Sequence, residues 1–227
     1  MSPPYVTREI VFRRAGPGPA DGEAGGASAA PPLKDFPTPC GACPDGNLPA
    51  SARRCGMPNY RRIRVPGGTY FFTINLLERR RRLLVERVGD LRASFRATHA
   101  ARPFEILAIV VLPDHLHCLW RLPAGDADNA NRWAQIKAGF SRRWPMEEWR
   151  SERRIVCRER GIWQRRYWER LIRDDNDLRR HVDYIHGNPV KHGHALRPAD
   201  WPYSSFGRWV NAGVYPVGWA VAPSDLP

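Results

Sequence analysis

Two apolar stretches joined by a two-residue turn constrain the fold of this chain most strongly. Residues 104–112 read FEILAIVVL and residues 115–122 read HLHCLWRL, with Pro113 and Asp114 between them. Apolar runs of this length that are rich in β-branched residues form strands, and a Pro-Asp pair is a turn signal. The two stretches therefore predict an antiparallel hairpin.

The second stretch carries two histidines one residue apart. Successive side chains of a strand point to opposite faces, so His115 and His117 share one face while Leu116 lies on the other. One face would pack in a core and the other would present two imidazoles. Such a pair binds a metal ion only when a third ligand arrives from elsewhere, and otherwise it finds hydrogen-bond partners. The stretch alone leaves both interpretations open.

The remaining periodic segments extend the hairpin into a recognisable order of elements. They are a strand over 69–76, a helix over 85–101, a helix over 128–144, a strand over 161–172, and a helix that begins at Asp174 or Asp175 and ends before Pro189. With the hairpin included, this is the split βαβ, ferredoxin-like pattern followed by a C-terminal helix. We therefore expect an α+β fold whose antiparallel sheet has helices on one face and an open face for a ligand.

Composition divides the chain near residue 56. Residues 1–56 contain 10 Pro, 8 Gly and 9 Ala, whereas all nine Trp come after residue 57. A segment so poor in large apolar side chains cannot bury enough surface to offset the entropy of ordering. We expect residues 1–56 to form a disordered extension and residues 57–227 to form the folded domain.

Positive charge is concentrated in that domain. The chain has a formal net charge of +13, of which the first 56 residues contribute +1, since they carry 6 basic and 5 acidic side chains. Arg supplies 33 of the 36 basic residues, and its planar fork of donors suits phosphates and base edges. A GC-rich genome would favour Arg over Lys, but it would not explain the net excess. The charge therefore favours a polyanionic partner, with nucleic acid the default.

No stretch approaches the roughly 18 consecutive apolar residues of a membrane-spanning helix. The first residues, MSPPYVTREIVFRR, lack the apolar core of a secretion signal. We expect a cytoplasmic protein, associated with the nucleoid if its partner is DNA.

A second group of chemically useful side chains lies in DYIHGNP, residues 183–189. On a helix, Tyr184 and Asn188 face the same way, because they are four residues apart. The apolar stripe that would dock this helix consists of other residues, namely Leu178, Val182 and Ile185. A phenol has a pKa of about 10 and needs activation to attack at neutral pH, which a metal ion on His115 and His117 could provide by polarising the target. The alternative is an ordinary surface tyrosine.

At this point the sequence resembles a known family. Five motifs occur in the order seen in REP-associated tyrosine transposases, relatives of the insertion sequence 200-like single-tyrosine transposases, where REP stands for repetitive extragenic palindrome. The resemblance covers residues 57–209. Its motifs are MPNYRRIRVPGGTYFF from Met57, LPDHLH from Leu112, GIWQRRYWERLI from Gly161, YIHGNPVKHG from Tyr184 and WPYSSF from Trp201.

The resemblance assigns roles to single residues. His115 and His117 match the metal-binding HUH motif, in which U is a bulky apolar residue, and Tyr184 matches the nucleophile. Asn188 occupies the position where related transposases place a glutamine metal ligand, with His186 the alternative third ligand. The family also implies a ferredoxin-like HUH fold, Mg²⁺ or Mn²⁺ as the ion, and cleavage and rejoining of single-stranded DNA through a 5′-phosphotyrosine intermediate.

The implied substrate is the hairpin formed by a repetitive extragenic palindrome. Three questions stay open: whether the chain is a catalytically silent hairpin-binding protein, whether it acts as a monomer or dimer, and whether residues 1–56 lie upstream of the true start, since relatives commonly begin near MPNYRR. Phosphate contacts and stacking surfaces would both be needed. Trp163, Tyr167 and Trp168 are stacking candidates. The phosphate-binding candidates are Arg79, Arg80, Arg81, Arg82, Arg142, Arg143, Arg165 and Arg166.

Overall fold

The computed structural model of the chain describes residues 64–220, so the expected disorder of residues 1–56 and the expected domain start at Met57 lie outside the described residues. None of the helices between residues 64 and 220 is long and apolar enough to cross a membrane. The elements are β1 Thr69–Asn75, α1 Leu83–Glu86, α2 Val88–Ala101, β2 Glu105–Val111, β3 His115–Arg121, α3 Asn129–Arg142, α4 Glu152–Val156, β4 Trp168–Leu171, α5 Asp175–Lys191, the 3₁₀ helix η1 Pro198–Asp200 and α6 Phe206–Asn211.

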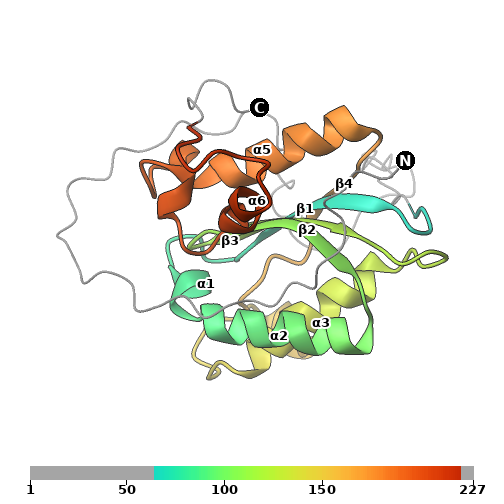
Figure 1. Ribbon diagram of the computed structural model, residues 1–227. Helices are drawn as coiled ribbons and strands as arrows, with labels where there is room; N and C mark the ends of the chain where they lie inside the picture. The colour runs from blue at the N-terminus through green and yellow to red at the C-terminus, as the bar shows by residue number, and fades with distance from the viewer. Residues whose placement is uncertain (1–63, 221–227) are drawn as a thin grey trace, which may run out of the picture. The chain divides into compact units, whose positions relative to one another are not determined.

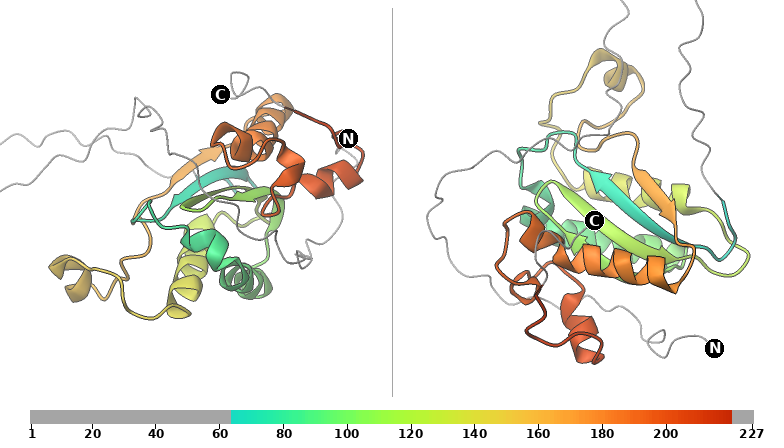
Figure 2. Two further views of the ribbon diagram at one scale, coloured as in Figure 1. Left: turned by 90° about the vertical axis from the view of Figure 1, so that its left-hand side faces the viewer. Right: turned by 90° about the horizontal axis from the view of Figure 1, so that it is seen from above.

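The four strands form one sheet in the order β2-β3-β1-β4, and every neighbouring pair is antiparallel. This is the strand order of the split βαβ pattern, and it confirms the predicted α+β, ferredoxin-like fold. Helices α2 and α3 cover one face of the sheet, and α5 lies across the other (Figures 1 and 2). The second face is therefore partly covered, rather than open across its width as the sequence suggested.

Alternation along the two central strands builds a separate core on each face of the sheet. On β1, Tyr70, Phe72 and Ile74 point into the core beneath α2 and α3, whereas Phe71 packs with Val182 and Ile185 of α5. On β3, the residues of the α2 and α3 core are Leu116, Cys118 and Trp120. Since side chains alternate, the odd-numbered residues of β3, including both histidines, lie on the α5 face.

Strand β2 lies at one edge of the sheet and is irregular. Its register with β3 shifts between Ile106 and Ala108, as at a β-bulge. The segment that leads into α6 covers this edge: the Ser205 hydroxyl accepts from the Ile109 N–H at 2.9 Å, and the Trp209 indole donates to the Leu107 carbonyl at 3.0 Å. These contacts satisfy backbone groups that an edge strand would otherwise expose.

The predicted strand over 161–172 is shorter in the structure, where only Trp168–Leu171 forms β4. The residues before it are drawn into the α2 and α3 core instead: Trp163 is buried, and its indole donates to the Lys137 carbonyl at 3.2 Å. One isolated bridge, between Leu76 and Trp163, is all that these residues add to the sheet. Burial of large side chains thus outweighs strand pairing here.

The helix boundaries also differ from the prediction at two places. The helix expected over 85–101 is divided at Arg87 into α1 and α2. Helix α5 does not stop before Pro189 but continues to Lys191. A proline in the last turn removes one backbone N–H donor, and here the helix tolerates that loss for two further residues.

Arg160 holds the segment between α3 and β4 in place. Its guanidinium pairs with the Glu148 carboxylate and donates to the Ser141 carbonyl at 2.6 Å and the Pro145 carbonyl at 2.9 Å. The hydrogen bond from Arg160 is the main reason why the pKa of Glu148 is lowered to about 2. The ion pair therefore joins the two flanks of the short helix α4, and the hydrogen bond to Ser141 ties them to the end of α3.

This ion pair should make stability depend on pH. Because the pKa of Glu148 falls from 4.5 to about 2 on folding, its stabilising contribution is complete above pH 4.5 and is lost as the pH falls towards 2. The Glu148→Gln variant should therefore lose less unfolding free energy than the parent over this window, measured by urea denaturation at several pH values. Glu147→Gln, at the exposed neighbouring position, is the matched control. Parallel pH profiles for parent and Glu148→Gln would contradict the assignment.

Candidate active site

The two histidines lie together on the α5 face of β3. Both side chains are buried, and the centroids of their rings are 5.0 Å apart. The register of β1 against β3 places Thr73 opposite His117, and the Thr73 hydroxyl lies 2.9 Å from Nδ1 of His117. A hydrogen bond at Nδ1 fixes the orientation of the ring and directs Nε2 away from the strand.

Asp114 orients the other histidine. Its carboxylate accepts a hydrogen bond from Nδ1 of His115 at 2.7 Å and another from Nε of Arg79 at 2.7 Å. Burial alone would raise the pKa of Asp114, but these two partners outweigh burial and hold that pKa well below its usual range. The carboxylate therefore stays ionised and orients the His115 ring through its Nδ1.

Tyr184 reaches the histidine pair from α5 of the same chain. Its ring centroid is 5.1 Å from that of His117 and 5.9 Å from that of Phe71. The ammonium of Lys191 lies over the ring, 4.9 Å from its centroid. Burial raises the pKa of the Tyr184 phenol, and the nearby Asn188 amide offsets part of this rise. The phenol is therefore protonated at neutral pH and needs help to become a nucleophile.

Three buried polar atoms beside Tyr184 make no hydrogen bond of normal geometry. They are Nε2 of His117 and both amide atoms of the fully buried Asn188. Burying such atoms costs free energy unless they have a hydrogen-bonding partner or a bound ion. Complete burial, followed by the charge of His115, lowers the pKa of His117 well below its usual value, so its imidazole is neutral.

Neutral imidazole nitrogen and an amide oxygen are donor types that divalent ions use. In the part of the chain that the structure describes, no three His, Cys, Asp or Glu side chains are grouped as a metal site would require. The set beside Tyr184 instead combines two histidines with Asn188. The donor types present at this site therefore suit a divalent ion.

His186, the alternative third ligand, lies elsewhere. Its Nε2 is 3.0 Å from the Ser205 hydroxyl, and its ring packs against Phe206, Trp209 and Tyr215. Burial lowers its pKa to about 3. His186 therefore joins α5 to the segment that covers β2 and does not face the histidine pair, which leaves Asn188 as the candidate third ligand.

Sequence reasoning missed four residues around the site, and only some of them had a local signal. Asp114 immediately precedes HLH, and Thr73 could have been found only from the strand register. Lys191 follows Tyr184 by seven residues, so it belongs to the same helical face as Asn188. His192 comes next, and its ring lies 5.2 Å from that of His115.

The candidate phosphate-binding arginines fall into three groups. Those over 79–82 lie in the exposed turn between β1 and α1, where Arg79 joins the site through Asp114. Arg165 and Arg166 are exposed before β4, and Arg165 pairs with Glu159 at 2.7 Å. Those at 142–143 end α3, on the opposite face of the sheet from Tyr184. Only the first group is placed beside the histidines.

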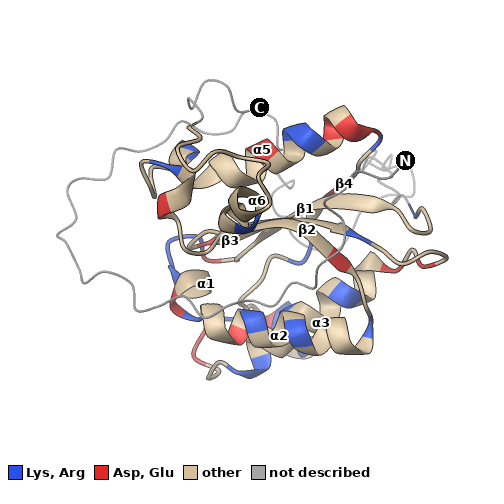
Figure 3. Cartoon of the chain, viewed as in Figure 1, with Lys and Arg blue, Asp and Glu red and all other residues tan. Residues whose placement is uncertain are grey.

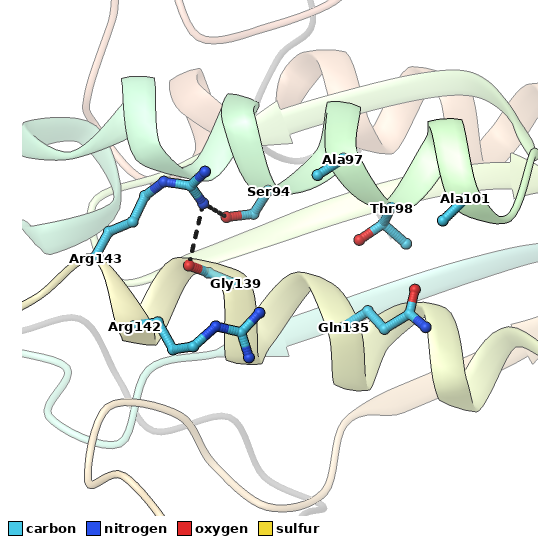
Figure 4. A pocket seen from close by; sticks show the side chains of 8 residues that line it. All are labelled: Ser94, Ala97, Thr98, Ala101, Gln135, Gly139, Arg142 and Arg143. Carbon is cyan, nitrogen blue, oxygen red and sulfur yellow. Dashed lines mark hydrogen bonds between the residues drawn. The ribbon is translucent and has the colours of Figure 1, made fainter.

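A groove of about 460 Å³ lies between α2 and α3, on the face away from the histidines (Figure 4). Arg143 closes one part of it by donating to the Ser94 hydroxyl at 3.0 Å and the Gly139 carbonyl at 3.2 Å. Lys and Arg residues are spread over α2, α3 and α5 (Figure 3). Neither this groove nor charge alone would have located the histidines and Tyr184.

Among the candidate stacking residues, Trp163 is buried in the core and is not available to a ligand. Tyr167 is half-buried and packs against Phe72 and Trp133. Trp168 is 45% exposed, and its ring contacts Phe71 on the α5 face. Of the three, only Trp168 presents substantial surface.

An antiparallel sheet of this strand order, with two alternating histidines on a central strand and a tyrosine helix packed over them, is the arrangement of the single-tyrosine HUH nucleases. No protein-family model matches the chain. Individual relatives do match, and they show to which family of these nucleases the chain belongs. The chain belongs to the REP-associated tyrosine transposases.

Two relatives carry this assignment. The chain is 46% identical over 170 residues to the REP-associated tyrosine transposase of Escherichia coli strain K12, covering 75% of this chain and 95% of the relative. It is 48% identical over 168 residues to a Haemophilus influenzae protein assigned to the same family, covering 74% of this chain and 96% of the relative. A solved structure of a REP-associated tyrosine transposase bound to a REP hairpin matches with a TM-score of 0.64 and 46% identity, over 74% of this chain and 93% of that one.

The role given to Asp114 can be tested through metal affinity. Asp114→Asn keeps the shape of the side chain but removes the charge that orients the His115 ring through its Nδ1. A change in such a supporting residue typically weakens metal binding roughly 10- to 100-fold. We expect that loss for Mn²⁺, measured as free Mn²⁺ by electron paramagnetic resonance. Asp90→Asn, on α2 across the sheet, should bind Mn²⁺ as the parent does, and equal affinity of Asp114→Asn and parent would contradict the role.

Proposed function

We propose that this chain cleaves and rejoins single-stranded DNA at hairpins formed by repetitive extragenic palindromes, with Tyr184 as the nucleophile. The observation that carries the proposal is the position of Tyr184, whose ring lies 5.1 Å from that of His117 among buried polar atoms that lack partners. The solved relative bound to a REP hairpin supports the choice of substrate. The excess of Arg supports a polyanion, and a substrate carried by the chromosome implies a cytoplasmic, nucleoid-associated protein.

His115, His117 and Asn188 would hold Mg²⁺ or Mn²⁺ in this proposal. The ion would polarise the scissile phosphate and offset the charge that develops on it. The chain's own contribution is to orient the ligands, through Asp114 for the first histidine and through Thr73 for the second. Both contacts are made by residues on or beside the central strands.

In the proposed reaction, Tyr184 attacks the phosphorus of the scissile phosphate. The phenolic oxygen loses its proton and forms a bond to phosphorus, the bond from phosphorus to the 3′ oxygen breaks, and that oxygen takes up a proton to become a free hydroxyl. The product is a 5′-phosphotyrosine. Attack by a 3′ hydroxyl on the same phosphorus reverses the step, rejoins the strand and restores the phenol.

Lys191 is placed to assist both directions of this exchange. Negative charge appears on the phenolic oxygen as its proton leaves, and it appears again when the phenolate departs during rejoining. A cation 4.9 Å from the ring centroid stabilises that charge. Burial removes part of the water around the Lys191 ammonium, which lowers its pKa. A charge with less water around it interacts more strongly with its neighbours, here the Tyr184 ring.

The nucleophile can be tested by removing one oxygen atom. Tyr184→Phe keeps the ring that contacts His117 and Phe71 but cannot bond to phosphorus. With end-labelled hairpin DNA and Mg²⁺ or Mn²⁺, we expect the parent to form a protein-DNA adduct that survives denaturing electrophoresis. The variant should form none, while its affinity for the hairpin stays within about twofold of the parent's. Tyr203→Phe, outside the site, should form the adduct.

Two results would change the conclusion. An adduct formed by Tyr184→Phe would remove Tyr184 from the role of nucleophile. If the parent bound hairpins tightly with either ion but never cleaved them, the chain would be a catalytically silent hairpin-binding protein.

Lys191 gives a separate prediction. Lys191→Met removes the charge and keeps a side chain of similar length, and it should slow single-turnover cleavage roughly 10- to 100-fold, as the loss of one electrostatic contact to a reacting group does. Lys191→Arg should restore much of the rate, because it restores the charge. Hairpin affinity and thermal stability should change little in either variant. An equal loss of rate in both variants would indicate a purely structural role.

A further inference from the structure

Beyond the residues already described, a row of aromatic side chains leads away from the histidine pair. The ring of His192 lies edge-on to His115, with centroids 5.2 Å apart. His194 is nearly parallel to His192 at 6.1 Å, and Trp201 is nearly parallel to His194 at 5.4 Å. We call His192, His194 and Trp201 the aromatic row. It begins beside His115, a candidate metal ligand, and ends at Trp201, in the segment that covers β2.

The end of α5 fixes the geometry of this row. Gly193 adopts a φ of +68°, a left-handed conformation that favours glycine. The His194 N–H bonds to the Pro189 carbonyl at 2.8 Å and the Gly193 N–H to the Val190 carbonyl at 3.0 Å, the two bonds of a Schellman motif. This turn reverses the chain at Gly193 and sets the two histidines on either side of it.

Two contacts fix the position of Trp201. Its indole N–H donates to the Val111 carbonyl at 2.9 Å, and its ring packs edge-on against Tyr203. His192 is exposed, while His194 and Trp201 are half-buried. The row therefore combines fixed rings with accessible surface, which is what a base needs for stacking.

Positive charge lies next to the row. Arg80, Arg81 and Arg82 are exposed in the turn between β1 and α1, and Arg79 of the same turn is tied to Asp114 at 2.7 Å. Asp114 in turn accepts a hydrogen bond from His115, whose ring contacts His192. The arginine turn is thus joined, through Asp114 and His115, to the start of the aromatic row.

We infer that the aromatic row and Arg80–Arg82 bind the unpaired DNA strand next to the scissile phosphate, with bases stacked on His192 and His194 and backbone phosphates on the arginines. This inference rests on the proposed function. It deepens that function by naming the surface that receives unpaired nucleotides rather than the duplex stem. Aromatic rings stack on any unpaired base but cannot reach bases inside a stem, so the chemistry favours a single strand.

The test compares three DNA ligands in the Tyr184→Phe background, where no adduct forms. They are a hairpin alone, the hairpin with a short unpaired tail, and the same tail built from abasic nucleotides. We expect the tail to increase affinity. His194→Ala should reduce affinity for the tailed hairpin about fivefold or more, the effect of losing one stacked base, and should leave affinity for the other two ligands unchanged.

Two further variants separate stacking from other effects. His194→Phe keeps an aromatic face and should restore most of the affinity for the tailed hairpin. His99→Ala is the matched control, because His99 is also exposed and packs against an aromatic ring, that of Phe104, but lies on α2 across the sheet. It should bind all three ligands as the parent does.

The arginines can be tested through salt dependence. Each phosphate contact to a single strand contributes about 0.7 to the slope of log affinity against log salt concentration. Replacing Arg80, Arg81 and Arg82 with glutamine should lower that slope for the tailed hairpin and leave it unchanged for the hairpin alone.

Three results would overturn the inference: a tail that adds nothing, a loss in His194→Ala that is equal for all three ligands, or an unchanged slope in the arginine variant. Failure of the parent to bind any hairpin would be a different result, because it would remove the proposed function itself.

Discussion

The register between β1 and β3 is the constraint on which the rest of the site depends. It sets Thr73 opposite His117 and Phe71 opposite Leu119, so that the histidines share a face with the residues that dock α5. A slip of one residue would exchange the two faces of β1 relative to its partner. The large rings of Tyr70 and Phe72, buried beneath α2 and α3, make such a slip costly, so the packing of one face fixes the chemistry of the other.

Helix α5 meets two requirements at once. Val182 and Ile185 bury apolar surface against the sheet, while Tyr184 and Asn188 bring polar groups to the same face. Burying polar atoms without partners costs free energy, and apolar packing along the helix offsets that cost. The same burial shifts the pKa values of Tyr184 and His117 away from their usual values, so the environment that holds the helix also sets the protonation states of the site.

Much of this could be predicted from the sequence, because the strongest signals were local. The apolar run over 104–112 and the turn signal at Pro113 and Asp114 predicted the hairpin, and the four-residue spacing from Tyr184 to Asn188 predicted their shared helical face. The contact of Thr73 with His117 depends on pairing between distant segments, which no local pattern contains. Tertiary packing also outweighed local signals at two residues. Trp163, predicted to lie in a strand, is buried in the core instead, and His186 contacts Ser205 because its side of α5 faces the segment before α6. The sequence likewise showed the charge of the arginines at 142–143 but did not indicate on which face of the sheet they lie.

The order in which the parts occur along the chain has a consequence for protein synthesis. The histidine pair is synthesised first, the tyrosine helix follows, and residues 201–209, which cover β2 and contact His186, come after it. Domains generally fold as units, and the helix that carries the candidate nucleophile is among the later parts of this one to be made. A prematurely terminated product would lack the tyrosine or the support of its helix. On the proposed function, a product that ends before Tyr184 would carry the histidine pair without the nucleophile and could not cleave DNA.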